Sequence, residues 1–273
     1  MIPAAFDFVR ADSVDGLLAT LIEHGDEAKI LAGGMSLIPL MKFRLAVPSV
    51  LVDAGRLDDL RYIRDGGDHV AIGALTRHRD LETNDLLAAE CGVVRAVAAE
   101  VGDNQVRHRG TIGGSVAHGD SASDLPAVLL ALDADFVIRG TGGERVVAAT
   151  DFFTGYFETV IAPDELLTEI RVPKSGPAGF SYQKFNRRAQ DWAIVGSVAL
   201  RVNGTTRVGL VNMGPTPIRA TGVEAALAEG ATATDAAGAA AEGSEPSADI
   251  NATAEYRGHL ARVLTRRALE AMV

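Results

Sequence analysis

Apolar and polar residues follow two kinds of pattern along the chain, one typical of amphipathic helices and one of buried strands. Between Val14 and Ile22 the apolar residues recur at helical spacing, and Ser13 stands where an N-cap is expected. Short segments that are mostly apolar, at 29–32, 50–53 and 70–74, predict strands. Helices, strands and turns therefore alternate, which is typical of α+β or α/β architecture.

The middle of the chain continues this pattern with helices, a polar loop and a β-hairpin. Thr76 is the expected cap of a helix that begins within residues 75–81. The polar residues 103–110 predict a loop. The glycine-rich residues 140–143 predict the turn of a hairpin, and a later strand ends at Pro173. Further helices or helical turns are predicted at 37–42, 57–60, 86–101 and 125–132.

A linker at residues 174–177 predicts a boundary between two domains. We place the first domain at 1–175, with lobes at about 1–57 and 58–175, and the second at 178–273. The second domain is expected to hold a three-stranded antiparallel sheet and helices, from strands at 179–185, 193–202 and 207–211 and an alanine-rich helical part from residue 220. A terminal helix at 253–272 should bury one face, formed by Tyr256, Leu260, Val263, Leu264, Ala268 and Leu269.

Composition and charge narrow the class of protein. The chain has 273 residues, enough for two domains with separate cores, and a formal net charge of −10. Its basic runs are no longer than the pairs Arg187-Arg188 and Arg266-Arg267, so a nucleic-acid surface is not expected. Neither a signal sequence nor a membrane-spanning run is recognisable, and we expect a cytoplasmic protein.

The chain has one cysteine, Cys91, within the predicted helix 86–101. A disulfide within the chain is therefore impossible, and an iron–sulfur cluster has no ligand set here. We favour a buried structural thiol over a reactive one. Signatures of Rossmann, P-loop, zincin and nucleophile-elbow sites are lacking, and the six histidines show no metal-ligand spacing.

Two glycine runs are the strongest candidates for a binding site. Residues 32–36 and 111–115 each carry a Gly-Gly pair followed within two residues by a serine. Glycine turns can aim successive backbone N–H groups into one concavity, which binds phosphate without a lysine. The alternative is that both are ordinary turns. If the two runs face each other, they suit the two phosphates of a dinucleotide.

Asp124 follows the second run and precedes the predicted helix 125–132. Ser123 and Asp124 occupy positions where a helix cap is expected. Asp124 could instead accept a hydrogen bond from a ligand held by the second run. The residues themselves leave both interpretations open.

Three longer motifs identify a family resemblance. Ala32-Gly33-Gly34-x-Ser36-Leu37-x-Pro39-Leu40-Met41-Lys42 is the first, Gln105-Val106-Arg107-x-x-Gly110-Thr111-Ile112-Gly113-Gly114-Ser115 the second, and Ala117-His118-x-Asp120-x-x-Ser123-Asp124-Leu125-Pro126 the third. Together they resemble the FAD-binding medium subunit of the molybdenum hydroxylases, the xanthine dehydrogenase and aerobic carbon monoxide dehydrogenase family. The similarity continues through 151–156 and 165–173 to Tyr256-Arg257, so it covers nearly the whole chain.

The resemblance implies an α+β chain with a two-lobed vanillyl-alcohol-oxidase (PCMH)-type FAD domain followed by a small α+β domain. It implies that Asp124 bonds flavin hydroxyls, that the Leu167 backbone meets the ring edge, that Lys184 lies near the ring's polar end and that Trp192 covers the ring or, alternatively, packs in the core. Met35 replaces a residue that is often polar, which leaves only its backbone role. The implied FAD-binding residues are Leu31, Ala32, Gly33, Gly34, Met35, Ser36, Leu37, Thr111, Gly113, Gly114, Ser115, Ala117, Asp124, Leu167, Lys184 and Trp192.

The resemblance also implies partners. Molybdopterin is expected in a large subunit and two [2Fe-2S] clusters in a small one, as a dimer of heterotrimers. Because this chain cannot ligate clusters, its FAD would receive electrons from the partner and pass them to an external acceptor, with no catalytic or metal-binding residue of its own. The alternatives are an autonomous FAD-dependent oxidoreductase of the same fold and a scaffold subunit that has lost its flavin, against which the intact glycine runs argue.

Overall fold

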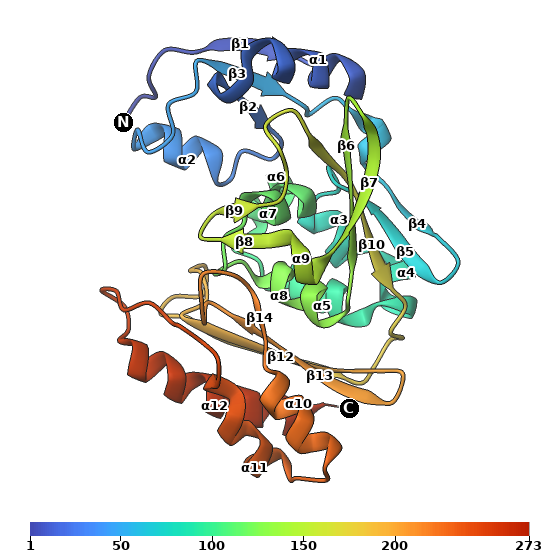
Figure 1. The fold of residues 1–273 in the computed structure, drawn as a ribbon, viewed down its shortest axis with the longest axis vertical. Helices are drawn as coiled ribbons and strands as arrows, with labels where there is room; N and C mark the ends of the chain where they lie inside the picture. Colours follow the sequence, from blue (N-terminus) through green and yellow to red (C-terminus); the bar gives the residue numbers. More distant parts are fainter. Residues whose placement is uncertain (273) are drawn as a thin grey trace.

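The computed structural model describes residues 1–272, and Val273, the last residue of the predicted second domain, lies outside them. Figure 1 shows three bodies stacked along the long axis: an N-terminal lobe, a middle lobe and a C-terminal lobe. Each body is built on a sheet with helices beside it, which confirms the predicted α+β class.

The N-terminal lobe holds a parallel three-stranded sheet in the order β1-β3-β2. The apolar residues of β3 are buried because this strand lies between the other two. Ser13 caps α1 by accepting from the Gly16 amide at 3.0 Å, as predicted. The elements are β1 (Asp7–Arg10), α1 (Val14–His24), η1 (Gly25–Glu27), β2 (Ala28–Leu31), α2 (Leu37–Lys42) and β3 (Val50–Asp53).

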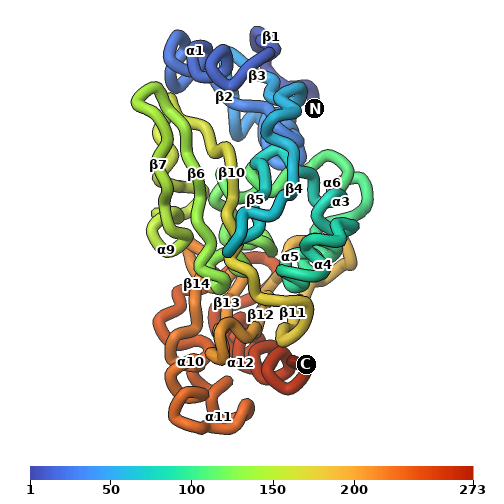
Figure 2. The backbone as a smooth tube through the Cα atoms, turned by 90° about the vertical axis from the view of Figure 1, so that its right-hand side faces the viewer, coloured from blue at the N-terminus to red at the C-terminus, as the bar shows by residue number. Residues whose placement is uncertain are grey.

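The middle lobe holds an antiparallel five-stranded sheet in the order β4-β5-β10-β6-β7. The turned view in Figure 2 shows α3 to α6 on one side of this sheet. Apolar residues of α3, α4, α5, α7 and α8 form the largest core cluster with Ile72, Phe136 and Ile170 of the sheet. The strands are β4 (Ile63–Asp65), β5 (His69–Gly73), β6 (Asp135–Gly140), β7 (Gly143–Ala148), β8 (Phe153–Gly155), β9 (Glu158–Thr159) and β10 (Leu166–Pro173). The helices are η2 (Asp58–Leu60), α3 (His78–Glu82), α4 (Asp85–Glu90), α5 (Gly92–Ala99), α6 (Asn104–Arg109), α7 (Ile112–His118), α8 (Asp124–Ala131) and α9 (Ala149–Phe152).

The C-terminal lobe holds an antiparallel sheet in which a two-residue strand, β14, joins the three strands that were predicted. One face of this sheet packs against α12 and the other against α8 of the middle lobe, so both faces are buried. Val198 and Leu200 accordingly belong to the core of the middle lobe, and Val195 and Ala199 to that of the C-terminal lobe. The elements are β11 (Phe180–Phe185), β12 (Val195–Val202), β13 (Thr205–Val211), β14 (Ile218–Arg219), α10 (Thr221–Ala228), α11 (Ala233–Ala236), η3 (Ala237–Ala241) and α12 (Ala254–Ala271).

The predicted helix 86–101 is wrong as one element, because the chain breaks at Cys91 into α4 and α5. The Gly92 amide bonds the Gly176 carbonyl at 3.0 Å, and a Cβ at Gly92 would lie 2.5 Å from the Pro177 carbonyl. The segment that follows β10 therefore lies too close to Gly92 for one helix to continue through this position. Cys91 is fully buried, and burial raises its pKa to about 11, which confirms a structural thiol.

Two further expectations for the middle lobe are wrong. Residues 103–110 form helix α6 and not a loop, because the Asp103 carboxylate accepts from the Val106 amide at 2.9 Å and caps it. Thr76 caps no helix. Its buried hydroxyl bonds the Tyr62 carbonyl at 2.9 Å, and α3 begins at His78 with Arg77 as its N-cap.

The terminal helix is confirmed, but Tyr256 of its predicted apolar face is 43% exposed. The neighbouring Arg257 is buried instead. Its guanidinium donates to the Ile194 carbonyl and, at 2.8 Å, to the Asp249 carboxylate. Arg257 therefore ties α12 to the start of β12.

His78, at the start of α3, is 4% exposed and has no hydrogen-bond partner for Nδ1 within residues 1–272. Burial, and secondly the positive charge of Arg107, lower the pKa of His78 to about 4. The imidazole is therefore neutral at physiological pH.

We expect Arg257→Met to lower the free energy of unfolding by about 2–4 kcal/mol, because the Ile194 carbonyl and Asp249 both lose a charged donor. Urea unfolding measures this effect. Arg262→Met, on the same helix but exposed, is the matched control and should change the stability by less than about 0.5 kcal/mol. Equal losses in the two variants would contradict the structural role of Arg257.

His78 should make the protein less stable at acidic pH. Below the ordinary histidine pKa the unfolded chain binds a proton that the folded chain does not bind until the pH approaches 4. Between pH 8 and pH 5 the wild type should therefore lose about 2 kcal/mol more than His78→Gln in urea unfolding. Exposed His259→Gln controls for the loss of a histidine. Parallel pH curves for wild type and His78→Gln would contradict this prediction.

Candidate functional site

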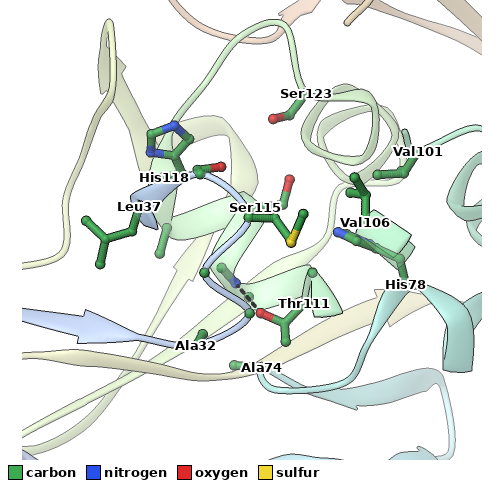
Figure 3. A pocket seen from close by; sticks show the side chains of 18 of the residues that line it. Ala32, Leu37, Ala74, His78, Val101, Val106, Thr111, Ser115, His118 and Ser123 are labelled. Carbon is green, nitrogen blue, oxygen red and sulfur yellow. Dashed lines mark hydrogen bonds between the residues drawn. The ribbon is translucent and has the colours of Figure 1, made fainter. Parts of the chain in front are cut away.

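A cavity of about 390 Å³ lies where the three lobes meet. The N-terminal lobe contributes the segment between β2 and α2, the middle lobe contributes α7 and β10, and the C-terminal lobe contributes Lys184 and Trp192. Figure 3 shows Ala32, Leu37, Thr111 and Ser115 around the same space. The two glycine runs are thus neighbours, although residues 37–110 separate them in the chain.

The first glycine run leaves several successive backbone amides unpaired, as expected for a phosphate-binding turn. None of the backbone N–H groups of residues 33–37 has a hydrogen-bond acceptor within residues 1–272, because pairing with β3 ends at Leu31. Gly34 turns the chain with a φ of 74°, which favours glycine. Consecutive unpaired amides in such a turn make a site of positive potential that suits an anion.

The second glycine run is not the predicted turn. Gly113 and Gly114 lie in the first turn of α7, which Thr111 caps through a 3.1 Å bond from the Gly114 amide. The amides of Ile112, Gly113 and Ser115 are also paired, to the carbonyls of Thr76, Ala74 and Thr111. The expectation of a second set of free amides is therefore wrong.

The second run contributes close packing and a hydroxyl group. A Cβ at Gly113 would lie 2.5 Å from Ala74, and one at Gly114 would lie 3.8 Å from the Ala32 Cβ of the first run. Glycine at position 113 lets α7 approach Ala74, which follows β5, and glycine at position 114 leaves room for the Thr111 hydroxyl, from which a Cβ would lie 2.8 Å. Ser115, the next residue of the helix, lines the cavity.

Asp124 lies at the other side of the cavity and is 6% exposed. Its carboxylate accepts from the Tyr182 hydroxyl at 2.5 Å and from Lys184 Nζ at 2.9 Å. Burial raises the pKa of Asp124, and the Lys184 charge and both hydrogen bonds oppose that rise. Neither Ser123 nor Asp124 makes a capping hydrogen bond, so the capping interpretation is wrong for their side chains.

The other predicted residues are placed as follows. Leu167 precedes a bulge in β10, between Leu167 and Glu169, and lines the cavity. Trp192 is 59% exposed at the cavity wall, so the alternative of core packing is wrong. Leu31 is not part of the cavity wall within the described chain, and its side chain packs beside Gly34 instead. The wall does include Ala32, Gly33, Gly34, Met35, Ser36, Leu37, Thr111, Gly113, Gly114, Ser115, Ala117, Asp124, Leu167, Lys184 and Trp192.

The sequence analysis did not assign His78, Val101 and Val106 to the site, yet all three line the cavity. Figure 3 shows them together on one wall. Val101 stood at the end of a predicted helix and Val106 in a predicted loop. Recognition of Asp103 as an N-cap would have predicted α6, but no pattern in the sequence indicates that its apolar residue faces a ligand.

The arrangement combines an anion site, a buried ion pair and apolar walls in one cavity. Such a cavity suits a ligand that carries both an anionic group and an apolar part. No helix among residues 1–272 is long and apolar enough to span a membrane.

Comparison with known families agrees with this geometry. The family described as the FAD binding domain in molybdopterin dehydrogenase matches residues 4–175, and the family described as the CO dehydrogenase flavoprotein C-terminal domain matches residues 180–272. The two matches follow each other along the chain and cover almost all of it.

Individual proteins are similar over the same length. The carbon monoxide dehydrogenase medium chain of Hydrogenophaga pseudoflava is 39% identical over 99% of this chain and 98% of its own. Subunit alpha of the 6-hydroxypseudooxynicotine dehydrogenase complex of Paenarthrobacter nicotinovorans is 39% identical over 98% and 95%. The solved structure of the Hydrogenophaga pseudoflava carbon monoxide dehydrogenase that lacks the Mo-pyranopterin moiety has a TM-score of 0.95 and 40% identity, covering 100% of this chain and 98% of that one. The chain therefore belongs to the family of FAD-binding medium chains of the molybdenum-containing dehydrogenases, and it is an oxidoreductase subunit.

Proposed function

We propose that FAD binds in the cavity between the lobes and that the chain is the electron-transfer subunit of a heteromeric molybdenum hydroxylase. One observation carries this proposal, namely the unpaired amides of residues 33–37 opposite the start of α7. A diphosphate needs such donors, and the chain has no lysine in either glycine run to supply them.

The residues present fit FAD. Where the two runs meet, a Cβ at Gly33 would lie 2.3 Å from the Arg109 carbonyl, so the backbone there approaches without side chains in between. Residues 32–37 and 111–115 would hold the diphosphate and its flanking sugars. Asp124, the Leu167 backbone and Lys184 would bond polar groups of the flavin, and Trp192 would cover the ring. When bound, FAD supplies the chemistry that collects single electrons into a pair.

An electron-transfer role follows from what this chain cannot hold itself. Its one cysteine, Cys91, is buried away from the cavity with a raised pKa, so [2Fe-2S] clusters must belong to another subunit. We propose a small partner with two clusters that delivers the electrons, and a large partner with molybdopterin that oxidises the substrate. The chain's residues then bind, orient and tune the flavin, and an external acceptor takes the electrons.

Further parts of the proposal concern organisation. We place the FAD domain at 1–175 and the second domain at 178–273, in a dimer of heterotrimers located in the cytoplasm. The relatives named as medium chains or complex subunits support a multi-subunit enzyme.

Gly114→Val should abolish FAD retention, because its branched side chain would enter the space between α7 and Ala32. We expect the FAD affinity to fall at least about 100-fold, because the extra side chain overpacks the binding site. Equilibrium titration of FAD fluorescence measures this change. Gly142→Val, at a turn where a Cβ would meet nothing within 4 Å, is the control. Full FAD occupancy in Gly114→Val would show that the phosphates lie elsewhere.

The chain purified alone should be yellow, should be reduced by dithionite, and should not be reduced by small organic substrates. The reason is that the oxidised substrate would bind the molybdenum subunit and not this one. Anaerobic absorption spectra with dithionite and with candidate substrates provide the measurement. Turnover of a substrate by the lone chain would favour the alternative, an autonomous FAD-dependent oxidoreductase.

A further inference from the structure

Tyr182 is a half-buried residue of β11 that does not line the cavity but contacts a residue that does. Its hydroxyl donates to Asp124 Oδ1 at 2.5 Å. The other carboxylate oxygen, Oδ2, accepts from Lys184 Nζ at 2.9 Å, and Lys184 also donates to the Glu100 carbonyl at 3.0 Å. Asp124 and Lys184 both line the cavity. Tyr182 therefore contacts, from outside the cavity, an ion pair that lines the cavity.

The geometry holds the Tyr182 hydroxyl firmly in place. Tyr182 pairs with Val198 in the sheet, so its backbone is fixed. A Cβ at Gly196, on the adjacent strand, would lie 2.9 Å from the Tyr182 hydroxyl, so this glycine leaves the room that the phenol needs. The tyrosine can reach Asp124 only because the C-terminal sheet packs directly on α8.

The ion pair depends on this hydroxyl because both charges are buried. Asp124 and Lys184 side chains are each 7% exposed. A carboxylate in such surroundings needs a donor for each oxygen, and within the described residues Tyr182 is the only donor to Oδ1. Without it, the carboxylate is held less firmly and its negative charge is less stable, while Lys184 keeps its place beside Glu100.

We propose that Tyr182 is a positioning residue for the flavin, which orients Asp124 and keeps the Asp124–Lys184 pair electrically balanced at the cavity wall. The inference rests on the proposed binding of FAD. Through this pair Tyr182 influences two properties of the cofactor, its affinity and its redox potential. The C-terminal lobe thus tunes a cofactor whose phosphates are held by the other two lobes.

The direction of the effect follows from the charges. Loss of the Tyr182 hydroxyl weakens the negative member of the pair, so the positive charge of Lys184 is less well compensated. A fixed cation stabilises the electrons added to a reduced flavin. Removal of the hydroxyl should therefore raise the redox potential.

The same fold offers a matched control. Tyr62 also donates to a buried carboxylate, Glu169 Oε2, at 2.6 Å, and Glu169 is paired with cations, Arg64 at 3.0 Å and Arg171 at 2.7 Å. Neither Tyr62 nor Glu169 lines the cavity. Tyr62→Phe thus removes an equivalent bond without touching the wall.

The test compares Tyr182→Phe with Tyr62→Phe in the full chain, measuring FAD affinity by fluorescence titration and potential by dye-coupled reductive titration. For Tyr182→Phe we expect FAD to bind about tenfold more weakly, the loss of one hydrogen bond to a charged group. A roughly tenfold preference for the reduced form corresponds to a potential about 30 mV higher for a two-electron couple. Tyr62→Phe should change neither quantity.

A double-mutant cycle separates positioning from a general structural effect. Asp124→Asn should also raise the potential, and Tyr182→Phe should add no further shift in the Asp124→Asn background, because its effect passes through Asp124. Additive shifts, or equal behaviour of Tyr182→Phe and Tyr62→Phe, would overturn the inference.

Three further outcomes keep the test decisive. If Tyr182→Phe does not fold, 3-fluorotyrosine placed at 182 or at 62 keeps each hydroxyl but changes its acidity, and only the substitution at 182 should move the potential. If the wild type binds no FAD, the proposed function itself fails. If the wild type binds FAD but the 182 variants match the 62 variants, only the role of Tyr182 fails.

Discussion

The structure depends on one contact between two stretches of backbone. Gly33 lies against the Arg109 carbonyl and Gly110, and Gly113 lies against Ala74, at distances that leave no room for a Cβ. The Gly33 contact brings the segment after β2 onto the residues just before α7 and so joins the N-terminal and middle lobes around a common cavity, while the Gly113 contact packs α7 against the residue that follows β5. A side chain at Gly33 or Gly113 would push the two packed segments apart, because the opposing atoms are mainly backbone atoms and cannot rotate away.

The unpaired amides beside this contact explain how a site for an anion can exist in an acidic protein. With a formal net charge of −10 the chain as a whole repels phosphate. The unpaired amides of residues 33–37 provide a local positive potential that does not depend on side-chain charge. At the opposite wall Lys184 is balanced by Asp124, so the buried pair adds little net charge there.

Sequence reasoning succeeded where the signal was local. Four predictions are confirmed because each depends on residues within a few positions of one another. They are the Ser13 cap, the strands at the apolar runs, the hairpin at 140–143 and the terminal helix. The predictions were wrong where contact with a distant segment determines the local structure. The break at Cys91 comes from the chain at Gly176 and Pro177, and the buried hydroxyl of Thr76 is held by Tyr62.

For the site, the sequence alone determined which segments are involved. They can be recognised from the order of residues in the glycine runs, from the acidic residue that follows them and from the family motifs. It could not determine how the runs are used. Only the tertiary structure decided that the amides of the first run stay unpaired, whereas those of the second run donate to the carbonyls of Thr76, Ala74 and Thr111. It alone also set His78 and Val101 on the wall and Tyr182 behind Asp124. The physical reason is that pairing and burial depend on which atoms face each other in space, and those partners lie far apart in the chain.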